Sequence, residues 1–136
     1  MILLDTSVVI GLAFGRVFAA GARLAIVEAA GRNSLFVSAV TAWEIGLLAT
    51  RTRRTGALIG NARRFFAAVV ADARLNVLPI DADTMLEAAY LLGVFHADPS
   101  DRMLVATARI GNLAFMSDDR AILDYAGLGH VRAIQA

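Results

Sequence analysis

Residues 34–50, SLFVSAVTAWEIGLLAT, decide the fold, because a short apolar run stands directly before a helical pattern. The run in SLFVS is continuous rather than alternating, which is typical of a strand buried on both faces of a parallel sheet. Ser38 ends the strand and is placed to cap a helix over residues 39–50. The stretch predicts one strand-to-helix unit of an α/β protein.

The same unit recurs along the chain. Further strands are predicted at residues 2–4, 76–80, 113–117 and 131–134. Helical patterns separate them, at residues 8–14, 16–31, 52–73 (a basic hairpin), 81–95, 99–111 and 119–127. This order predicts a three-layer α/β/α sandwich around a parallel sheet of four to five strands.

The composition indicates one domain spanning residues 1–136. With 58% hydrophobic residues, the chain can form one sizeable core but is short for two. No uncharged apolar run approaches the roughly 18 residues that cross a bilayer, and MILLDTSVVI lacks a basic leader, so we expect a cytoplasmic protein without membrane association. Cysteine is absent and His96 and His130 are isolated, which excludes thiolate sites and disfavours a zinc cluster.

Charge is unevenly distributed although the net charge is only +1. All thirteen basic residues are arginine, which excludes P-loop and Schiff-base chemistry because both need a lysine. Arginines concentrate in residues 50–76, where they suit phosphate contacts or form a solvated face. The candidates for nucleic-acid binding are Arg51, Arg53, Arg54, Arg63 and Arg64.

Acidic residues follow two of the predicted strands. Asp5 comes directly after residues 2–4, and Asp118 and Asp119 follow residues 113–117. The carboxyl ends of parallel strands meet at one edge of a sheet, so these acids are expected to lie close together. Asp5 and Asp119 can alternatively cap the helices that they precede.

Two further acids lie on apolar helix faces. Glu44 has Val40, Thr41, Leu47 and Leu48 as helical neighbours, although it could instead reach water from the helix edge. Asp101 is the third residue of a helix that Asp98 caps and Pro99 begins, so its alternative role is to complement the helix dipole. If Asp5, Glu44, Asp101 and Asp119 converge, the cluster needs a cation. Oxygen ligands without Cys or His select Mg²⁺, with Mn²⁺ as a substitute.

Four stretches together resemble one known family: LLDTSVVI, VSAVTAWEIGLL, HADPSDRMLVATA and MSDDRAI. In order and spacing they are similar to the PIN-domain family, in particular to VapC-type toxins of bacterial toxin–antitoxin modules. The resemblance implies an α/β/α fold and an Mg²⁺-dependent endoribonuclease. Its product ends would be a 5′-phosphate and a 3′-hydroxyl, formed by metal-activated water.

The resemblance also implies roles for individual residues. The four acids, catalytic and metal-binding, fall on Asp5, Glu44, Asp101 and Asp119. Accessory residues around them are Thr6, Ser7, Asp98 and Ser117. The chain departs from the family pattern twice: Leu48 stands where many relatives carry lysine, and Ser100 stands where they carry a bulky residue that narrows the rim. We expect His96 to be structural or to line the rim, and Trp43, Phe65 and Phe66 to belong to the core.

Partners follow from the same resemblance. A toxin needs a cognate antitoxin, whose helical tail is expected along a groove walled by Val8, Val9, Leu12, Val17, Phe18, Leu47 and Leu48. A homodimer through residues 86–95 is expected in addition to the RNA substrate. Two other functions stay open: a housekeeping PIN nuclease acting in RNA processing or on DNA flaps, and a catalytically silent binding module of the same fold.

Overall fold

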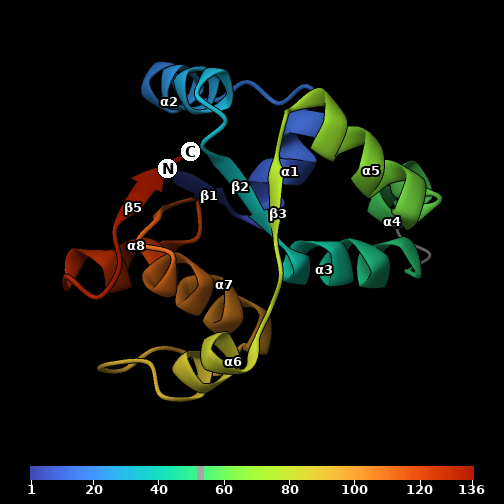
Figure 1. The fold of residues 1–136 in the computed structure, drawn as a ribbon. Coiled ribbons are helices and arrows are strands. Elements are labelled where there is room, and N and C mark those ends of the chain that lie inside the picture. The colour runs from blue at the N-terminus through green and yellow to red at the C-terminus, as the bar shows by residue number, and fades with distance from the viewer. Residues whose placement is uncertain (52–53) are drawn as a thin grey trace.

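The computed structural model describes residues 1–51 and 54–136 (Figure 1). Within those residues five strands form one fully parallel sheet in the order β3-β2-β1-β4-β5. The strands are β1 (Ile2–Leu4), β2 (Leu35–Ser38), β3 (Asn76–Leu78), β4 (Ala114–Ser117) and β5 (Ala133–Gln135). The predicted parallel sheet of four to five strands is confirmed.

Helices cover both faces of this sheet (Figure 1). They are α1 (Thr6–Ala13), α2 (Ala20–Gly31), α3 (Ala39–Ala49), α4 (Arg54–Ile59), α5 (Ala62–Asp72), α6 (Ala82–Ala89), α7 (Pro99–Ile110) and α8 (Arg120–Gly127). In the described part of the chain, none of these helices has the length and apolar character needed to span a bilayer.

Alternation along each strand divides the core into two. Leu4, Val37 and Met116 face α1, α2 and α5 on one side of the sheet. Leu3 and Phe115 face α7 and α8 on the other side, where α6 packs against α7. Because the central strands β1, β2 and β4 bury residues on both faces, they read as continuous apolar runs. The three-layer sandwich predicted from the order of strands and helices is confirmed.

The helix predicted over residues 81–95 is shorter than expected, because α6 ends at Ala89. The Arg102 guanidinium donates to the carbonyl oxygens of Ala88 (2.8 Å) and Ala89 (3.2 Å), and so caps the last turn of α6. The same group donates to the carbonyls of Phe95 and His96, both at 3.3 Å. A single arginine on α7 therefore holds residues 90–98 as a loop.

Residues 16–19 are also not helical, although the sequence pattern predicts a helix from Arg16. α1 ends at Ala13, and Gly15 has a φ of 69°, a left-handed conformation that favours glycine. The chain crosses from α1 to α2 as a loop at this point (Figure 1). Because the helix is broken here, the Arg16 side chain can reach Asp118, which follows β4.

The strand order places a crevice beside β1. The chain moves from β1 to β2 and β3 in one direction, whereas β4 and β5 lie on the other side of β1. In open α/β sheets, sites form at such a reversal, beyond the carboxyl ends of the two strands that flank it. Those ends carry Asp5 and Ser117.

Candidate active site

Asp5 lies at the centre of this crevice. Asp5 is only 7% exposed, and its side chain makes no capping hydrogen bond to α1. Instead its Oδ2 accepts hydrogen bonds from the hydroxyls of Ser7 (3.1 Å) and Ser117 (2.5 Å). Burial raises the pKa of Asp5, although these hydroxyls partly oppose that rise. A buried carboxylate that does not cap its own helix favours the functional interpretation over capping.

Ser117 connects Asp5 to Asp119. Its fully buried hydroxyl donates to Asp5 and accepts from the backbone N–H of Asp119 at 2.9 Å. Asp119 caps α8, since its Oδ1 accepts from the N–H groups of Ala121 (2.7 Å) and Ile122 (3.4 Å). The alternative prediction that Asp119 caps the next helix is therefore confirmed, and the residue also lines the cleft.

Glu44 reaches the same place from α3. Its Oε2 accepts a short hydrogen bond from the Thr6 hydroxyl, which also lies 3.1 Å from the Thr41 hydroxyl. Burial raises the pKa of Glu44, and the charges of Asp5 and Asp98 raise it further. The Glu44 carboxylate therefore turns inward, against the alternative that it extends from the helix edge into water.

Ser100 is a site residue whose role the sequence did not reveal. It is buried, and its hydroxyl forms a hydrogen bond to Glu44 that lowers the pKa of that carboxyl. Besides its small size at the rim, Ser100 therefore has a polar contact with one of the clustered acids. Leu48 lines the cleft, so no basic group occupies its position on α3.

Asp101 is the third residue of α7, which Pro99 begins. The helix is capped by Asp98, as predicted, because Asp98 accepts from the N–H groups of Ser100 (2.9 Å) and Asp101 (3.3 Å). Desolvation, followed by repulsion from Asp98, Asp5, Asp119 and Glu44, raises the pKa of Asp101 to about 7. His96 lies at the rim, with its Nε2 3.4 Å from Asp101 Oδ2.

Four elements thus direct acidic side chains into one cleft of about 460 Å³. It is lined by Asp5, Thr6, Ser7, Ile10, Glu44, Leu48, Asp101, Asp118 and Asp119. Across the described residues, no three acidic or histidine side chains lie close enough together to hold a metal ion. The donor set nevertheless fits a hard divalent cation, because the groups are carboxylates whose mutual repulsion and burial a cation would offset.

The predicted arginine surface is only partly described. Arg51, Arg63 and Arg64 are exposed, the last two on α5, whereas Arg53 lies outside the described residues and only the backbone of Arg54, the first residue of α4, is described. Trp43 is 51% exposed, so its assignment to the core is wrong. It lines a pocket of about 430 Å³ with Arg63 and Phe66.

Some of the residues predicted to wall a groove for a partner helix lie in the core instead. Val8 and Val9 are fully buried in the core and cannot wall a surface groove. An apolar groove of about 690 Å³ lies instead between α1, α2 and α5. Leu12 is the predicted wall residue that lines it.

Comparison with known proteins supports this architecture. A family model for the PIN domain matches residues 2–128. No curated protein shows a significant sequence match.

Solved structures share the fold over nearly the whole chain. VapBC2 from Rickettsia felis, bound to a DNA fragment of its promoter, is similar with a TM-score of 0.72 and 11% identity, covering 99% of this chain and 98% of that chain. FitAcB from Neisseria gonorrhoeae has a TM-score of 0.64 and 21% identity, covering 98% and 96%. A toxin–antitoxin complex from Klebsiella pneumoniae has a TM-score of 0.61 and 17% identity, also covering 98% and 96%.

Proposed function

This chain belongs to the PIN domain family, and on that premise we propose that it is an Mg²⁺-dependent endoribonuclease acting as the toxin of a toxin–antitoxin pair. One observation carries the proposal. The acids Asp5, Glu44 and Asp101 come from three different elements, enter one cleft, and all have raised pKa values there. Such an arrangement is costly to fold unless a bound cation compensates it.

The residues of the chain hold and orient the acidic groups. Ser117 fixes the Oδ2 of Asp5, and Thr6 fixes the Oε2 of Glu44, so neither carboxylate is free to swing into solvent. The hydrogen bond from Ser117 to Asp5 also ties the end of β1 to the end of β4. This preorganisation places negative oxygens where a phosphodiester and its neutralising cation would meet.

Asp5, Glu44, Asp101 and Asp119 would hold Mg²⁺ or Mn²⁺. When bound, the ion supplies Lewis-acid chemistry, activating water and offsetting charge on the phosphate. No side chain need form a covalent bond to the substrate. The contribution of the protein is therefore placement and electrostatics, and the exposed arginines Arg51, Arg63 and Arg64 would attract the strand.

Induction of the chain in a bacterial host tests the proposal. We expect growth arrest and new RNA 5′ ends by sequencing, and neither with the Asp5→Asn variant. A folded chain that cleaves no RNA in Mg²⁺ would overturn the nuclease assignment. Cleavage of RNA without growth arrest would refute the toxin role and favour a housekeeping nuclease.

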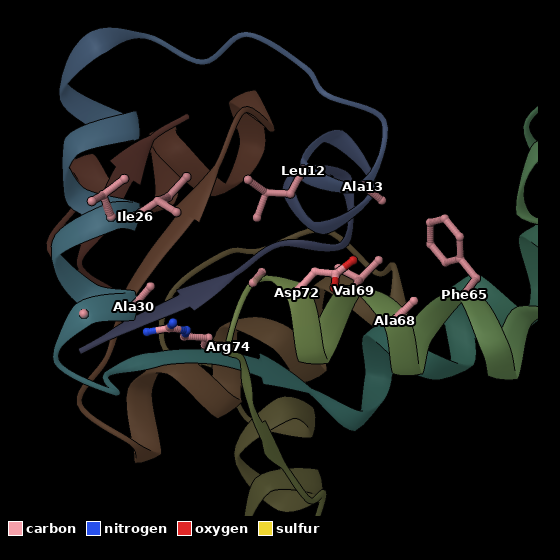
Figure 2. A pocket seen from close by; sticks show the side chains of 12 residues that line it. Leu12, Ala13, Ile26, Ala30, Phe65, Ala68, Val69, Asp72 and Arg74 are labelled. Carbon is pink, nitrogen blue, oxygen red and sulfur yellow. The ribbon is translucent and has the colours of Figure 1, made fainter.

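We propose that the cognate antitoxin occupies the apolar groove between α1, α2 and α5. Figure 2 shows Leu12, Ile26 and Val69 from these three helices around one space, with Asp72 and Arg74 nearby. The volume of about 690 Å³ and the apolar lining suit the apolar face of an amphipathic helix, and the two charges suit polar flanks on that helix. The similar structure from Klebsiella pneumoniae is itself a toxin–antitoxin complex. For this chain, the assignment of the antitoxin site rests on the groove.

A matched pair of substitutions on α2 tests the groove. Val27 and Leu24 are exposed to similar extents, 63% and 59%, but of the two only Val27 lines the groove. We expect Val27→Asp to weaken antitoxin binding on the order of a hundredfold, because a charge is buried, and Leu24→Asp to leave it unchanged. Calorimetric titration with the protein encoded upstream measures both. Equal effects would reject the groove.

We also propose that two copies pair through the end of α6 and the loop after it. The side chains of Leu86, Tyr90, Leu92 and Val94 are all exposed there, and exposed apolar side chains gathered in one segment are typical of an interaction site. Light scattering should report a dimer that Val94→Asp dissociates and Val17→Asp, at a similarly exposed position elsewhere, does not. A dimer unaffected by Val94→Asp would contradict this interface.

A further inference from the structure

The loop between α1 and α2 (Figure 1) carries Arg16, whose side chain is hydrogen-bonded to a residue of the acidic cleft. Its Nη2 donates to Oδ2 of Asp118, a residue that lines the cleft and lies 102 positions away along the chain. Within the described residues, no other arginine pairs with an acid that lines the cleft. The guanidinium therefore stands at the mouth of the proposed active site.

Three features hold Arg16 in this place. Its backbone N–H donates to the Gly11 carbonyl at 2.8 Å, and its guanidinium carbon lies 4.8 Å from the centre of the Phe18 ring. A Cβ at Gly11 would lie only 3.0 Å from Arg16 Cδ and Phe18 Cζ, so the glycine lets both side chains pack closely against α1. An arginine braced by an aromatic ring and a helix is more than a solvated charge.

The guanidinium keeps donors free for a ligand. Its one hydrogen bond among the described residues uses Nη2, whereas an arginine presents five donors in a planar fork. The side chains of Arg16 and Asp118 are 41% and 32% exposed, so the pair is open to solvent. Planar forks of this kind suit phosphate oxygens, which they bind with two parallel hydrogen bonds.

We propose that Arg16 is a substrate-positioning residue that exchanges Asp118 for a phosphate of the RNA strand next to the bond being cut. The proposal rests on the nuclease function above. Leu48 leaves α3 without a basic group at the cleft, and Arg16 supplies a positive charge beside Asp118 from the loop between α1 and α2. The exchange is easy because a solvent-exposed ion pair contributes little to stability, while contacts to phosphate are charge-assisted.

Two substitutions that should affect KM differently test this role. Arg16→Gln should raise KM for a fluorescein-labelled single-stranded oligoribonucleotide about tenfold with little change in kcat, and Arg16→Lys should restore part of the loss. Asp118→Asn should leave KM unchanged or lower it, because it releases the guanidinium. In an Asp5→Asn background that cannot cleave, Arg16→Gln should also reduce the salt slope of RNA binding by about 0.7.

The alternative is a purely structural ion pair. In that case Arg16→Gln and Asp118→Asn would change KM to the same extent. The two variants would also lower the melting temperature to the same extent. Either that result, or a KM that Arg16→Gln does not change in a chain that cleaves RNA, overturns the role of Arg16 but leaves the proposed nuclease function standing. A wild-type chain that neither binds nor cleaves the oligoribonucleotide overturns the inference and the proposed function together.

Discussion

Asp101→Asn should stabilise the metal-free protein at neutral and alkaline pH. The carboxyl has a pKa of about 7 in the fold, against 3.8 as the reference value, because desolvation and neighbouring acids disfavour its charge. A raised pKa means that the folded state holds the proton longer than the unfolded chain. The free energy of unfolding therefore falls as the pH rises through the window between the two values, and it stays low above about pH 7.

The magnitude follows from the size of the shift. Three pKa units correspond to about 4 kcal/mol, which solvent screening of a partly exposed group reduces to about 2 kcal/mol. Asn removes this penalty but also loses a favourable charge near the start of α7, worth about 0.5 kcal/mol. The cost of burying the charge beside other acids is the larger of the two effects. We expect the melting temperature of Asp101→Asn to exceed that of the wild type by about 5 °C at about pH 8 in EDTA.

Thermal melts at about pH 4.5 and about pH 8, with EDTA or with Mg²⁺, measure the effect. The two proteins should melt together at the lower pH, and Mg²⁺ at the higher pH should stabilise the wild type more than the variant. Asp124→Asn, at an exposed position on α8, is the matched control and should change little. A variant less stable than the wild type at pH 8 without metal would refute the reasoning. Asp5 and Glu44 should retain part of the pH dependence in the variant.

Further predictions concern activity and RNA binding. Asp5→Asn should lower the rate of RNA cleavage by about a hundredfold or more in Mg²⁺, measured with end-labelled RNA; a wild-type rate would exclude Asp5 from the metal site. Asp98→Asn should retain most activity because Asn caps a helix about as well as Asp, and an equal loss would instead make Asp98 a ligand. Replacing Arg51, Arg53 and Arg54 together should flatten the salt dependence of RNA binding, by about 0.7 for each lost phosphate contact; an unchanged slope would return them to solvated surface.

Local signals in the sequence account for much of the fold. Continuous apolar runs of strand length mark the central strands β1, β2 and β4, whose residues are buried from both sides. Apolar runs also predicted the edge strands β3 and β5, and all five predictions agree with the structure to within two residues at each end. Capping chemistry also acts over a few residues, so Ser38 and Asp98 could be assigned as caps before the fold was known. The four acids were found in the same way, because a carboxylate after a buried strand or on an apolar helix face is costly and therefore conspicuous.

Long-range contacts decided the remainder. The helical pattern of residues 81–95 continues beyond Ala89, yet Arg102 binds the last carbonyls of α6 and so ends the helix there. In the loop that follows, Gly93 has a φ of 69° and lies close against His130. Similarly, sequence spacing could not place Arg16 against Asp118 or Ser100 against Glu44.

The sequence by itself therefore determined where the strands lie, which residues cap α3 and α7, and which acids are chemically unusual, since these depend on side-chain type and near neighbours. Only the tertiary structure decided that β1 and β4 lie side by side at the reversal of strand order, which brings Asp5 and Ser117 together across 112 residues. It also placed the apolar groove between α1, α2 and α5 rather than along Val8 and Val9. Such placements depend on how whole helices pack against the sheet, and no local pattern encodes that packing.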